Sequence, residues 1–228
     1  MPRLLPRKKT LKRLRWPKTN DLPLHHTHIT FIDVVMKTDI ILAGVGGQGI
    51  LSIATILGAA SLKENLYIKQ AEVHGMSQRG GDVQSNLRLS SSPIASDLIP
   101  LGGADIIVSL EPMEALRYLP YLKPDGWVVT STAPFVNIPD YPDMGAIEAE
   151  LAALPHVVAF DMDAVAKEVA TVRSSNMVLL GAASPFIELS GEVIEEAIRT
   201  IFGAKGEKIV NSNLEAYRAG RSRVNKQK

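Results

Sequence analysis

The fold of this chain is set by residues 39–63, which read DIILAGVGGQGILSIATILGAASLK. Asp39 to Ala43 is a short apolar run of the kind that forms a buried strand. Gln48 to Lys63 then carries apolar residues at the spacing of a helix. These positions are Ile50, Ile53, Ala54 and Leu57. With the glycine-rich turn between the two parts, the segment predicts one strand–turn–helix unit.

Strand and helix patterns alternate over the rest of the chain. We expect further strands at residues 66–71, 82–90, 104–110, 127–132 and 156–160, with a turn at residues 124–126. The strand at 82–90 alternates apolar and polar side chains, which is typical of a half-exposed strand. We expect helices at residues 112–119, 146–154, 164–172, 176–187, 191–202 and 214–219. The alternation predicts an α/β fold, a three-layer Rossmann-like domain with a central, mostly parallel sheet.

The composition is that of an ordinary globular protein. A chain of 228 residues with 46% apolar residues can bury a core and fits one large domain or one domain plus an appendage. Apolar runs are interrupted well before 18 positions, and the basic N-terminal segment is not followed by an apolar stretch. We therefore expect a cytoplasmic protein without a membrane span.

Cysteine is absent from the sequence. This excludes disulfides, cysteine catalysis, thiolate zinc sites and cysteine-ligated iron–sulfur clusters in this chain. Any electrons must be handled by another protein.

Charge is distributed unevenly along the chain. Residues 1–35 hold eight Lys or Arg and two Asp, a net charge of +6, so the chain from Met36 onward carries −5. Four prolines and the lack of an apolar period predict a disordered extension here. We favour translation from Met36; a solvated basic tail and a nucleic-acid or targeting arm are the alternatives. The expected organisation is this extension at 1–35, a domain at 36–220 and a polar tail at 221–228.

The glycine turn is the first candidate site. Gly44, Gly46, Gly47 and Gly49 place a G-x-G-x-x-G pattern between a strand and a helix. Glycines allow a tight turn and close backbone approach, and the amides at a helix start attract anions. A nicotinamide site would also need an acid after the second strand, for which Glu72 is the candidate. Alternatively, the glycines only let the strand and helix pack closely.

The second candidate is the segment EVHGMSQRGG, residues 72–81. It brings an acid, a histidine, an arginine and three glycines into one loop between two strands. Such a loop could direct Arg79 to a phosphate or carboxylate, with Glu72 or His74 bonding nearby. The alternative is that Glu72 pairs with Arg79 and the glycines serve only backbone conformation.

The remaining residues give weaker support for a functional site. His25, His26 and His28 lack a nearby partner ligand, so we expect no metal site. Ser109 and Glu111 follow a buried strand, where a serine more often caps a helix. His156 opens a strand without a visible partner. The sequence contains no G-x-S-x-G elbow and no P-loop lysine, which disfavours hydrolases and kinases.

Taken together, the turn Gly44–Gly49 and the segment Glu72–Gly81 resemble the gamma-type domain of the 2-oxoacid:ferredoxin oxidoreductases. Within that family, the likeness is to the separate beta subunit of the indolepyruvate type. Residues 105–111, 176–181 and 211–220 support it, and it spans Met36 to Gly220.

The resemblance implies a division of labour. In this family an arylpyruvate is decarboxylated on thiamine diphosphate, electrons pass through iron–sulfur clusters to ferredoxin, and coenzyme A takes the acyl group. A large alpha subunit carries the thiamine and the clusters. The resemblance therefore implies that this chain is inactive alone and needs no membrane or nucleic acid. Its loops, with Gly44, Gly46, Gly47, Gly49, Glu72, His74, Ser77, Arg79, Gly80 and Gly81, would complete the site or seat coenzyme A.

Two other classes of function remain open. One is an NAD(P)-dependent Rossmann dehydrogenase that would use Gly44, Gly46 and Gly49 for the pyrophosphate. The other is a stand-alone nucleotide- or coenzyme A-binding module.

Overall fold

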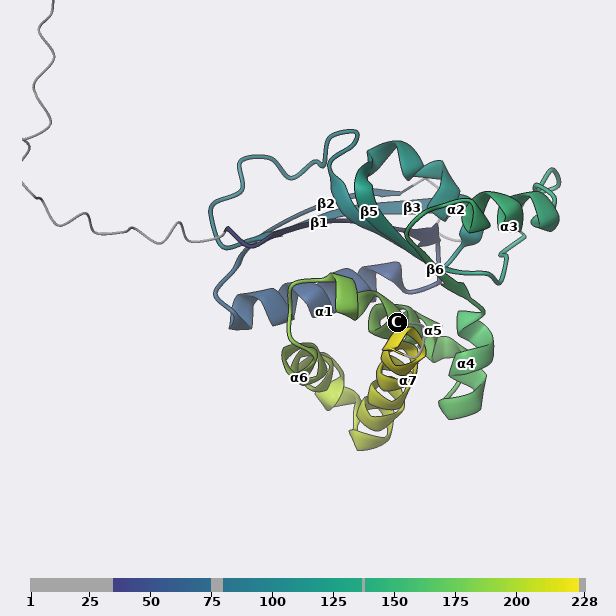
Figure 1. Ribbon diagram of the computed structural model, residues 1–228. Helices are drawn as coiled ribbons and strands as arrows, with labels where there is room; N and C mark the ends of the chain where they lie inside the picture. The colour runs from purple at the N-terminus through teal and green to yellow at the C-terminus, as the bar shows by residue number, and fades with distance from the viewer. Residues whose placement is uncertain (1–34, 75–79, 137, 226–228) are drawn as a thin grey trace, which may run out of the picture. The chain divides into compact units, whose positions relative to one another are not determined.

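A six-stranded sheet in the order β2-β3-β1-β4-β5-β6 forms the centre of the computed structural model (Figure 1). The structure describes residues 35–74, 80–136 and 138–225. The strands are β1 (Lys37–Val45), β2 (Tyr67–His74), β3 (Asp82–Ser90), β4 (Ala104–Ser109), β5 (Leu122–Ser131) and β6 (Val157–Phe160).

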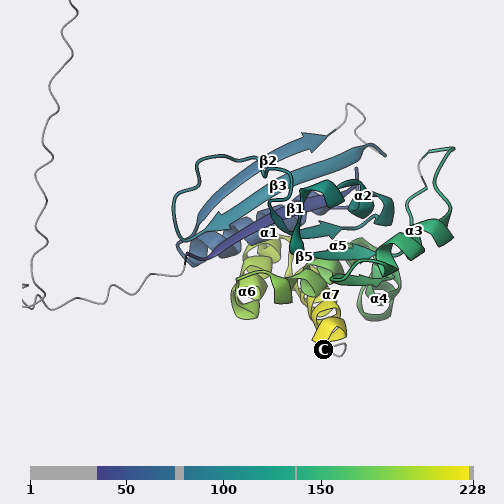
Figure 2. The same ribbon diagram turned by 45° about the horizontal axis from the view of Figure 1, so that its top comes forward.

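The sheet is mostly parallel, as the sequence predicts. β1 pairs with β4, β4 with β5 and β5 with β6 in parallel. β3 runs antiparallel between β1 and β2, so β2 points in the same direction as β1 without touching it. Figure 2 shows these three strands side by side. The carboxyl ends of β1, β2, β4, β5 and β6 therefore share one edge of the sheet, which we call the carboxyl edge.

Helices cover both faces of the sheet, which confirms the three-layer architecture (Figure 1). α2 (Pro112–Arg117) and α3 (Met144–Ala152) lie on one face. α1 (Ile50–Lys63), α4 (Met162–Val169) and α5 (Ser175–Ala183) lie on the other. Beyond them, α6 (Gly191–Phe202) packs on α1, and α7 (Glu207–Asn225) packs on α5. Short 3-10 turns span Leu119–Tyr121, Val172–Ser174, Ser184–Phe186 and Gly203–Lys205.

The core has two parts, one on each side of the sheet. Ile40 and Leu42 of β1 face the larger part, which α1, α5, α6 and α7 complete. Ile41 and Ala43 face the smaller part under α2 and α3. β1 is thus buried on both faces, which explains why its sequence is a continuous apolar run.

Two glycines permit a very close crossing of α5 and α7. A Cβ atom on Gly181 would lie 1.9 Å from the carbonyl oxygen of Tyr217, and one on Gly220 would lie 1.9 Å from that of Val178. Both distances are far below contact, so the crossing requires glycine at both positions. The two glycines lie in segments that contribute to the family resemblance, and their role is in packing.

The half-exposed pattern expected for β3 is wrong on its polar face. Asn86 is buried because its Oδ1 accepts the backbone N–H of Ile99 at 3.1 Å. Arg88 donates to the carbonyl oxygens of Ser96 and Leu98 at 3.1 and 2.9 Å. The segment after β3 therefore folds back over the strand, which a period-two pattern cannot reveal.

Several element boundaries also differ from expectation. β2 runs to His74, so Glu72 to His74 lie on a strand and not in the expected loop. The turn expected at residues 124–126 lies within β5 as an irregularity, because Ala104 pairs with Leu122 while Ile106 pairs with Trp127. The last helix is longer than the expected 214–219. α7 continues through residues 221–225, and Val224 is buried against the core.

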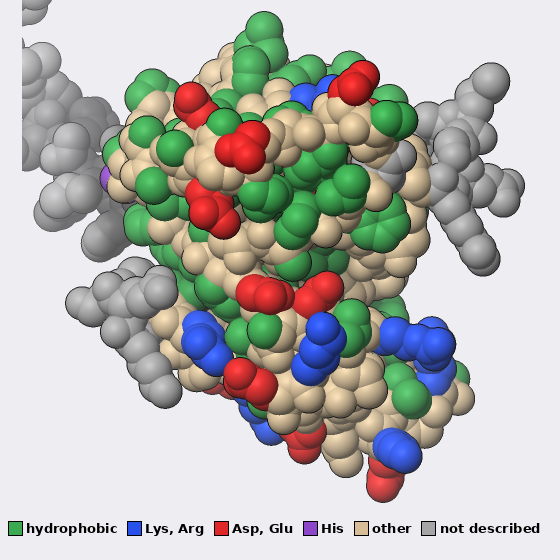
Figure 3. Space-filling view, turned by 90° about the vertical axis from the view of Figure 1, so that its right-hand side faces the viewer, with side chains coloured by type: hydrophobic (Ala, Val, Ile, Leu, Met, Phe, Trp, Pro, Cys, Tyr) green, Lys and Arg blue, Asp and Glu red, His purple; other side chains and the backbone are tan. Residues whose placement is uncertain are grey.

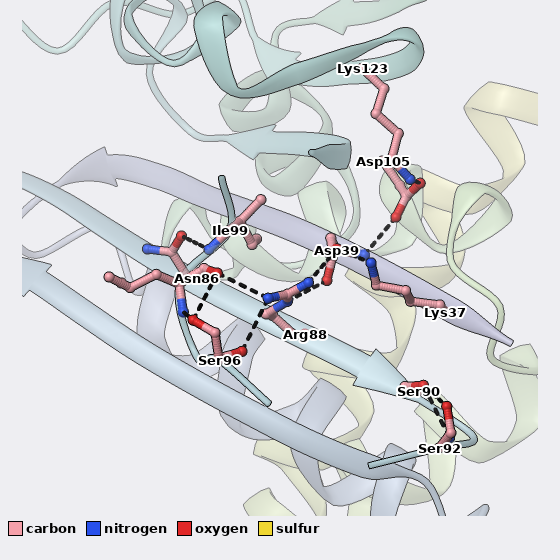
Figure 4. A network of polar contacts seen from close by, with 11 residues as sticks. Lys37, Asp39, Asn86, Arg88, Ser90, Ser92, Ser96, Ile99, Asp105 and Lys123 are labelled. Atoms are coloured by element: carbon pink, nitrogen blue, oxygen red, sulfur yellow. Dashed lines mark hydrogen bonds and ion pairs between the residues drawn. The ribbon is translucent and has the colours of Figure 1, made fainter. Parts of the chain in front are cut away.

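An ionic network closes the opposite edge of the sheet, where β1 begins (Figure 4). Arg88 Nε and Nη2 bind the two carboxylate oxygens of Asp39 at 2.7 and 2.9 Å, and Lys37 Nζ lies 2.9 Å from Oδ2. Asp105 Oδ2 accepts the Asp39 N–H at 2.7 Å, and Lys123 pairs with Asp105. Burial would raise the pKa of Asp39, but the hydrogen bonds and charges of Arg88 and Lys37 outweigh it and lower that pKa.

Candidate functional site

The two glycine segments meet at the carboxyl edge. Gly46 donates its backbone N–H to the carbonyl oxygen of Gly81 at 2.8 Å, and Gly80 donates back to Gly46 at 3.4 Å. The strand order explains the contact: β3 lies between β1 and β2, and it starts at this edge beside the end of β1.

Two of the turn glycines serve close packing. A Cβ atom on Gly44 would lie 2.8 Å from Gln48 Oε1. Gly49 has a φ of +81°, and a Cβ there would lie 2.7 Å from Nδ2 of Asn176. That same Nδ2 donates to the carbonyl oxygen of Gly49 at 3.2 Å, which ties the start of α1 to α5. These contacts agree with the packing interpretation for Gly44 and Gly49, and a ligand role at the two positions stays a prediction.

Two other glycines line open space. Gly47 has a φ of +103° and Gly80 a φ of +78°, and a Cβ on either would meet nothing within 4 Å. Positive φ favours glycine at both positions. Of the two, Gly47 is exposed, and among the described residues nothing covers it.

Gln48 is the residue of the turn that the sequence analysis missed. Its Oε1 accepts the backbone N–H of Val45 at 2.7 Å, and its Nε2 donates to the carbonyl oxygen of Leu110 at 3.3 Å. The side chain therefore joins the end of β1 to the segment after β4. One sign of this role is visible in the sequence: Gln48 is the only residue with a long polar side chain in the turn Gly44–Gly49.

The start of α1 suits an anion. Gly49 is its N-cap and supplies no side-chain hydrogen bond, and the first turn contains no acidic residue. The amides of the first turn and the helix dipole give this end a partial positive charge. Beside the open surface at Gly47, the helix start is compatible with a phosphate or carboxylate.

Glu72 is not placed as a nicotinamide site requires. It is exposed on β2 and accepts a hydrogen bond from Gln70 Nε2 at 2.5 Å. In the sheet, Glu72 pairs with Ser85 of β3, which pairs in turn with Leu42 of β1. Two strand spacings of about 4.8 Å separate Glu72 from β1. The acid of a dinucleotide site follows the strand next to the glycine turn, so this arrangement disfavours the dehydrogenase hypothesis.

The remaining candidates of the second segment are only partly described. The backbone of His74 ends β2 and pairs with Val83. Ser77 and Arg79 lie outside the described residues, and so does the alternative pairing of Arg79 with Glu72.

A buried acid organises the segment after β4. Glu111 accepts from the backbone N–H of Glu114 at 2.8 Å, so Glu111 is the N-cap of α2. The expectation of a serine cap is therefore wrong: Ser109 Oγ instead donates to the carbonyl oxygen of Glu111 at 2.7 Å. Glu111 Oε1 also accepts from the hydroxyl of Tyr141 and from the backbone N–H of Phe135, the latter at 3.4 Å.

Neighbouring groups respond to this acidic, dehydrated environment. Burial raises the pKa of Glu114, although Arg117 binds it at 2.8 Å and opposes the shift. Burial and the charges of Glu114 and Asp82 raise the pKa of Tyr118 to about 12. Burial and the hydrogen bond to Glu111 raise the pKa of Tyr141.

The described residues contain neither a cluster of metal ligands nor a helix that could span a membrane. Residues 35–74, 80–136 and 138–225 hold no group of three His, Asp or Glu side chains that could bind a metal ion. His25, His26 and His28 lie outside these ranges. His156 does have a neighbour, since its ring stacks on Trp127 at 5.0 Å. Within the described part of the chain, no helix is long and apolar enough to cross a membrane.

The sequence has clear relatives. Residues 39–223 match the family model described as pyruvate ferredoxin/flavodoxin oxidoreductase. The chain is 38% identical over 192 residues to the indolepyruvate oxidoreductase subunit IorB of Pyrococcus horikoshii. The aligned region covers 80% of this chain and 93% of that subunit. It is 34% identical over 194 residues to the corresponding subunit of Archaeoglobus fulgidus, covering 81% and 94%.

Solved structures share the fold. The 2-oxoglutarate:ferredoxin oxidoreductase of Magnetococcus marinus, solved with 2-oxoglutarate, coenzyme A and succinyl-CoA, aligns with a TM-score of 0.67 and 26% identity. The alignment covers 84% of this chain but only 31% of that longer one. The gamma subunit of a keto/oxoacid ferredoxin oxidoreductase from Geobacter sulfurreducens aligns with a TM-score of 0.60 and 22% identity, over 83% of this chain and 99% of that one.

Proposed function

The chain belongs to the pyruvate ferredoxin/flavodoxin oxidoreductase family, and from this premise we propose that it is the small subunit of an indolepyruvate-type 2-oxoacid:ferredoxin oxidoreductase. The observation that carries the proposal is the 38% identity to a complete indolepyruvate oxidoreductase subunit, 93% of which is matched. The contact between the two glycine segments agrees with it, because the segments that suggest the family lie together in space.

The proposed reaction needs groups that a partner must supply. A 2-oxoacid loses carbon dioxide, its acyl carbon passes to the thiol of coenzyme A, and two electrons reduce two ferredoxins with release of one proton. Iron–sulfur clusters are held by cysteine thiolates, and this chain has none. We therefore assign the clusters and thiamine diphosphate, which stabilises the carbanion left by decarboxylation, to a large alpha subunit.

The contribution of this chain is the carboxyl edge of its sheet. The exposed Gly47, beside the start of α1, suits a phosphate group of coenzyme A or a carboxylate of the partner. We propose that Arg79 adds positive charge to this surface. Glu72, His74, Ser77 and Gly81 belong to the same segment and would shape its border.

Co-purification with the large subunit tests the proposal. The tagged full chain should bring down a cysteine-rich partner, and the pair should reduce ferredoxin with an arylpyruvate and coenzyme A. Failure of the two chains to associate would contradict the proposal. Hydride transfer to a nicotinamide, or tight coenzyme A binding by this chain alone, would favour the dehydrogenase or the stand-alone module.

Arg79→Ala tests the anion surface within that complex. We expect a higher KM for coenzyme A or weaker subunit affinity, with the melting temperature of the isolated chain nearly unchanged. A variant that melts early but keeps normal coenzyme kinetics and affinity would make Arg79 structural.

We also propose that residues 1–35 are dispensable. The family match begins only at residue 39. A chain that starts at Met36 should remain soluble and bind the partner with the affinity of the full chain. Loss of either property would make the extension a working part of the protein.

A further inference from the structure

The segment between β5 and α3 exposes three apolar side chains. Phe135, Val136 and Ile138 are 43%, 66% and 41% exposed, and we call them the apolar tip. Their segment projects beyond the sheet next to α3 (Figure 1). Single exposed apolar residues need no explanation, but three within four positions on one projecting segment indicate an interaction surface.

The apolar tip is attached to the fold by a buried carboxylate. Glu111 is fully buried, and its Oε1 accepts both the backbone N–H of Phe135 and the hydroxyl of Tyr141. The first bond holds the first residue of the tip, and the second holds a residue that follows the tip in the chain. A fixed surface loses less conformational entropy on binding than a loose one, so the anchor favours tight docking.

The tip lies beside the proposed coenzyme surface. Gln48 of the glycine turn donates to the carbonyl oxygen of Leu110, and the next residue, Glu111, holds the tip. The tip and the glycine turn are thus linked at the same edge of the sheet through Gln48 and Glu111.

The surroundings of the tip are acidic. Between Ser131, where β5 ends, and Ala166 the sequence holds six Asp or Glu and no Lys or Arg. Figure 3 shows the carboxyl edge with hydrophobic side chains gathered in its upper half, acidic side chains around them, and Lys and Arg mainly in the lower half. A partner that fits this surface presents an apolar pocket bordered by Lys or Arg.

We infer that the apolar tip is the point at which the large alpha subunit docks, through an apolar pocket with a basic border. The inference rests on the proposed function for the identity of the partner. The Magnetococcus marinus enzyme agrees with it, because the region similar to this chain is there one part of a longer polypeptide.

Affinity measurements with the full-length chain test the inference. The double variant Phe135→Asp, Val136→Asp should bind the large subunit at least about tenfold more weakly, because it places two charges in an apolar pocket. Leu101→Asp is the matched control: Leu101 is 70% exposed and precedes β4, at the opposite edge of the sheet. It should bind like the wild type.

The outcomes separate the two proposals. If the wild type binds the large subunit and the double variant binds it equally tightly, the docking inference is overturned and the proposed function stays intact. Absence of wild-type binding overturns both. If the double variant melts early, a photo-crosslinking amino acid at position 136 decides: crosslinks to the large subunit from 136 and none from 101 support the inference, and the reverse contradicts it.

Discussion

Gly46 and Gly81 are joined by a 2.8 Å hydrogen bond between the N–H of the first and the carbonyl oxygen of the second. The bond makes one surface from two segments that belong to different strand connections. A second bond, from the N–H of Gly80 to the carbonyl oxygen of Gly46, helps to hold the two backbones together.

Gly49 should be the least replaceable residue of the turn. Gly49→Ala places a side chain at positive φ and 2.7 Å from the Asn176 amide, so we expect it to lower the free energy of unfolding by about 2–4 kcal/mol. Gly47→Ala meets open space and should cost only about 1 kcal/mol for its φ. Denaturant unfolding of both variants checks the order, and equal losses would contradict the packing role of Gly49.

The α5–α7 crossing should tolerate no side chain at Gly220. Gly220→Ala forces the helices apart and should cost about 3 kcal/mol or more, because the added atom would overlap the backbone of Val178. Gly203→Ala is the control, since a Cβ there meets nothing within 4 Å. It should be neutral or slightly stabilising. Thermal melting of the two variants distinguishes them; similar melting temperatures would show that the crossing is looser than described.

The Asp39 network should stabilise the fold in a pH-dependent way. Asp39→Asn removes the buried charge partner of Arg88, whose own side chain is 11% exposed, and should cost up to about 3–5 kcal/mol at neutral pH. Glu168→Gln breaks an exposed pair with Arg223 and should cost less than about 1 kcal/mol.

The sign of the pH effect follows from the lowered pKa of Asp39. Its contribution is complete above the unfolded value of about 3.9 and is lost as the pH falls through the folded value. Unfolding titrations of the wild type should therefore lose more stability in acid than those of Asp39→Asn. Parallel curves would contradict the network's role.

Tyr118 should make the protein sensitive to alkali. Its pKa of about 12 exceeds the unfolded value of about 10, so its contribution is complete below about pH 10 and is lost as the pH rises through the folded value. Tyr118→Phe should show a shallower decline of the unfolding free energy above about pH 10. An unchanged slope would assign the decline to other groups.

The sequence predicts the kinds of elements here better than their arrangement. β1 and α1 are recognisable because burial on both faces and helical spacing leave direct traces at Ile40, Leu42, Ile53 and Leu57. The insertion of β3 between β1 and β2 leaves no such trace in the sequence. An apolar strand has the same sequence pattern whichever strand lies next to it. Arg88 looks exposed in sequence because its cover comes from a segment without regular structure.

The candidate site was predictable only in part. The glycines can be identified as candidates from their residue type alone. Gln48 and Glu111 cannot, because their partners are distant in sequence: Gln48 binds Leu110, and Glu111 binds Tyr141. Polar residues of this kind resemble ordinary surface residues until the fold buries them. The role of His74, Ser77 and Arg79 in binding an anion stays a prediction from the sequence.

The most direct test of the account is a reconstitution of ferredoxin reduction from separately purified subunits. Indolepyruvate, coenzyme A and oxidised ferredoxin are mixed with this chain, with the large alpha subunit, or with both, and ferredoxin reduction is followed by absorbance. The account predicts that this chain alone reduces no ferredoxin and that the two chains together do so faster than the large subunit alone. Ferredoxin reduction by this chain alone, or a mixture no faster than the large subunit, would contradict it.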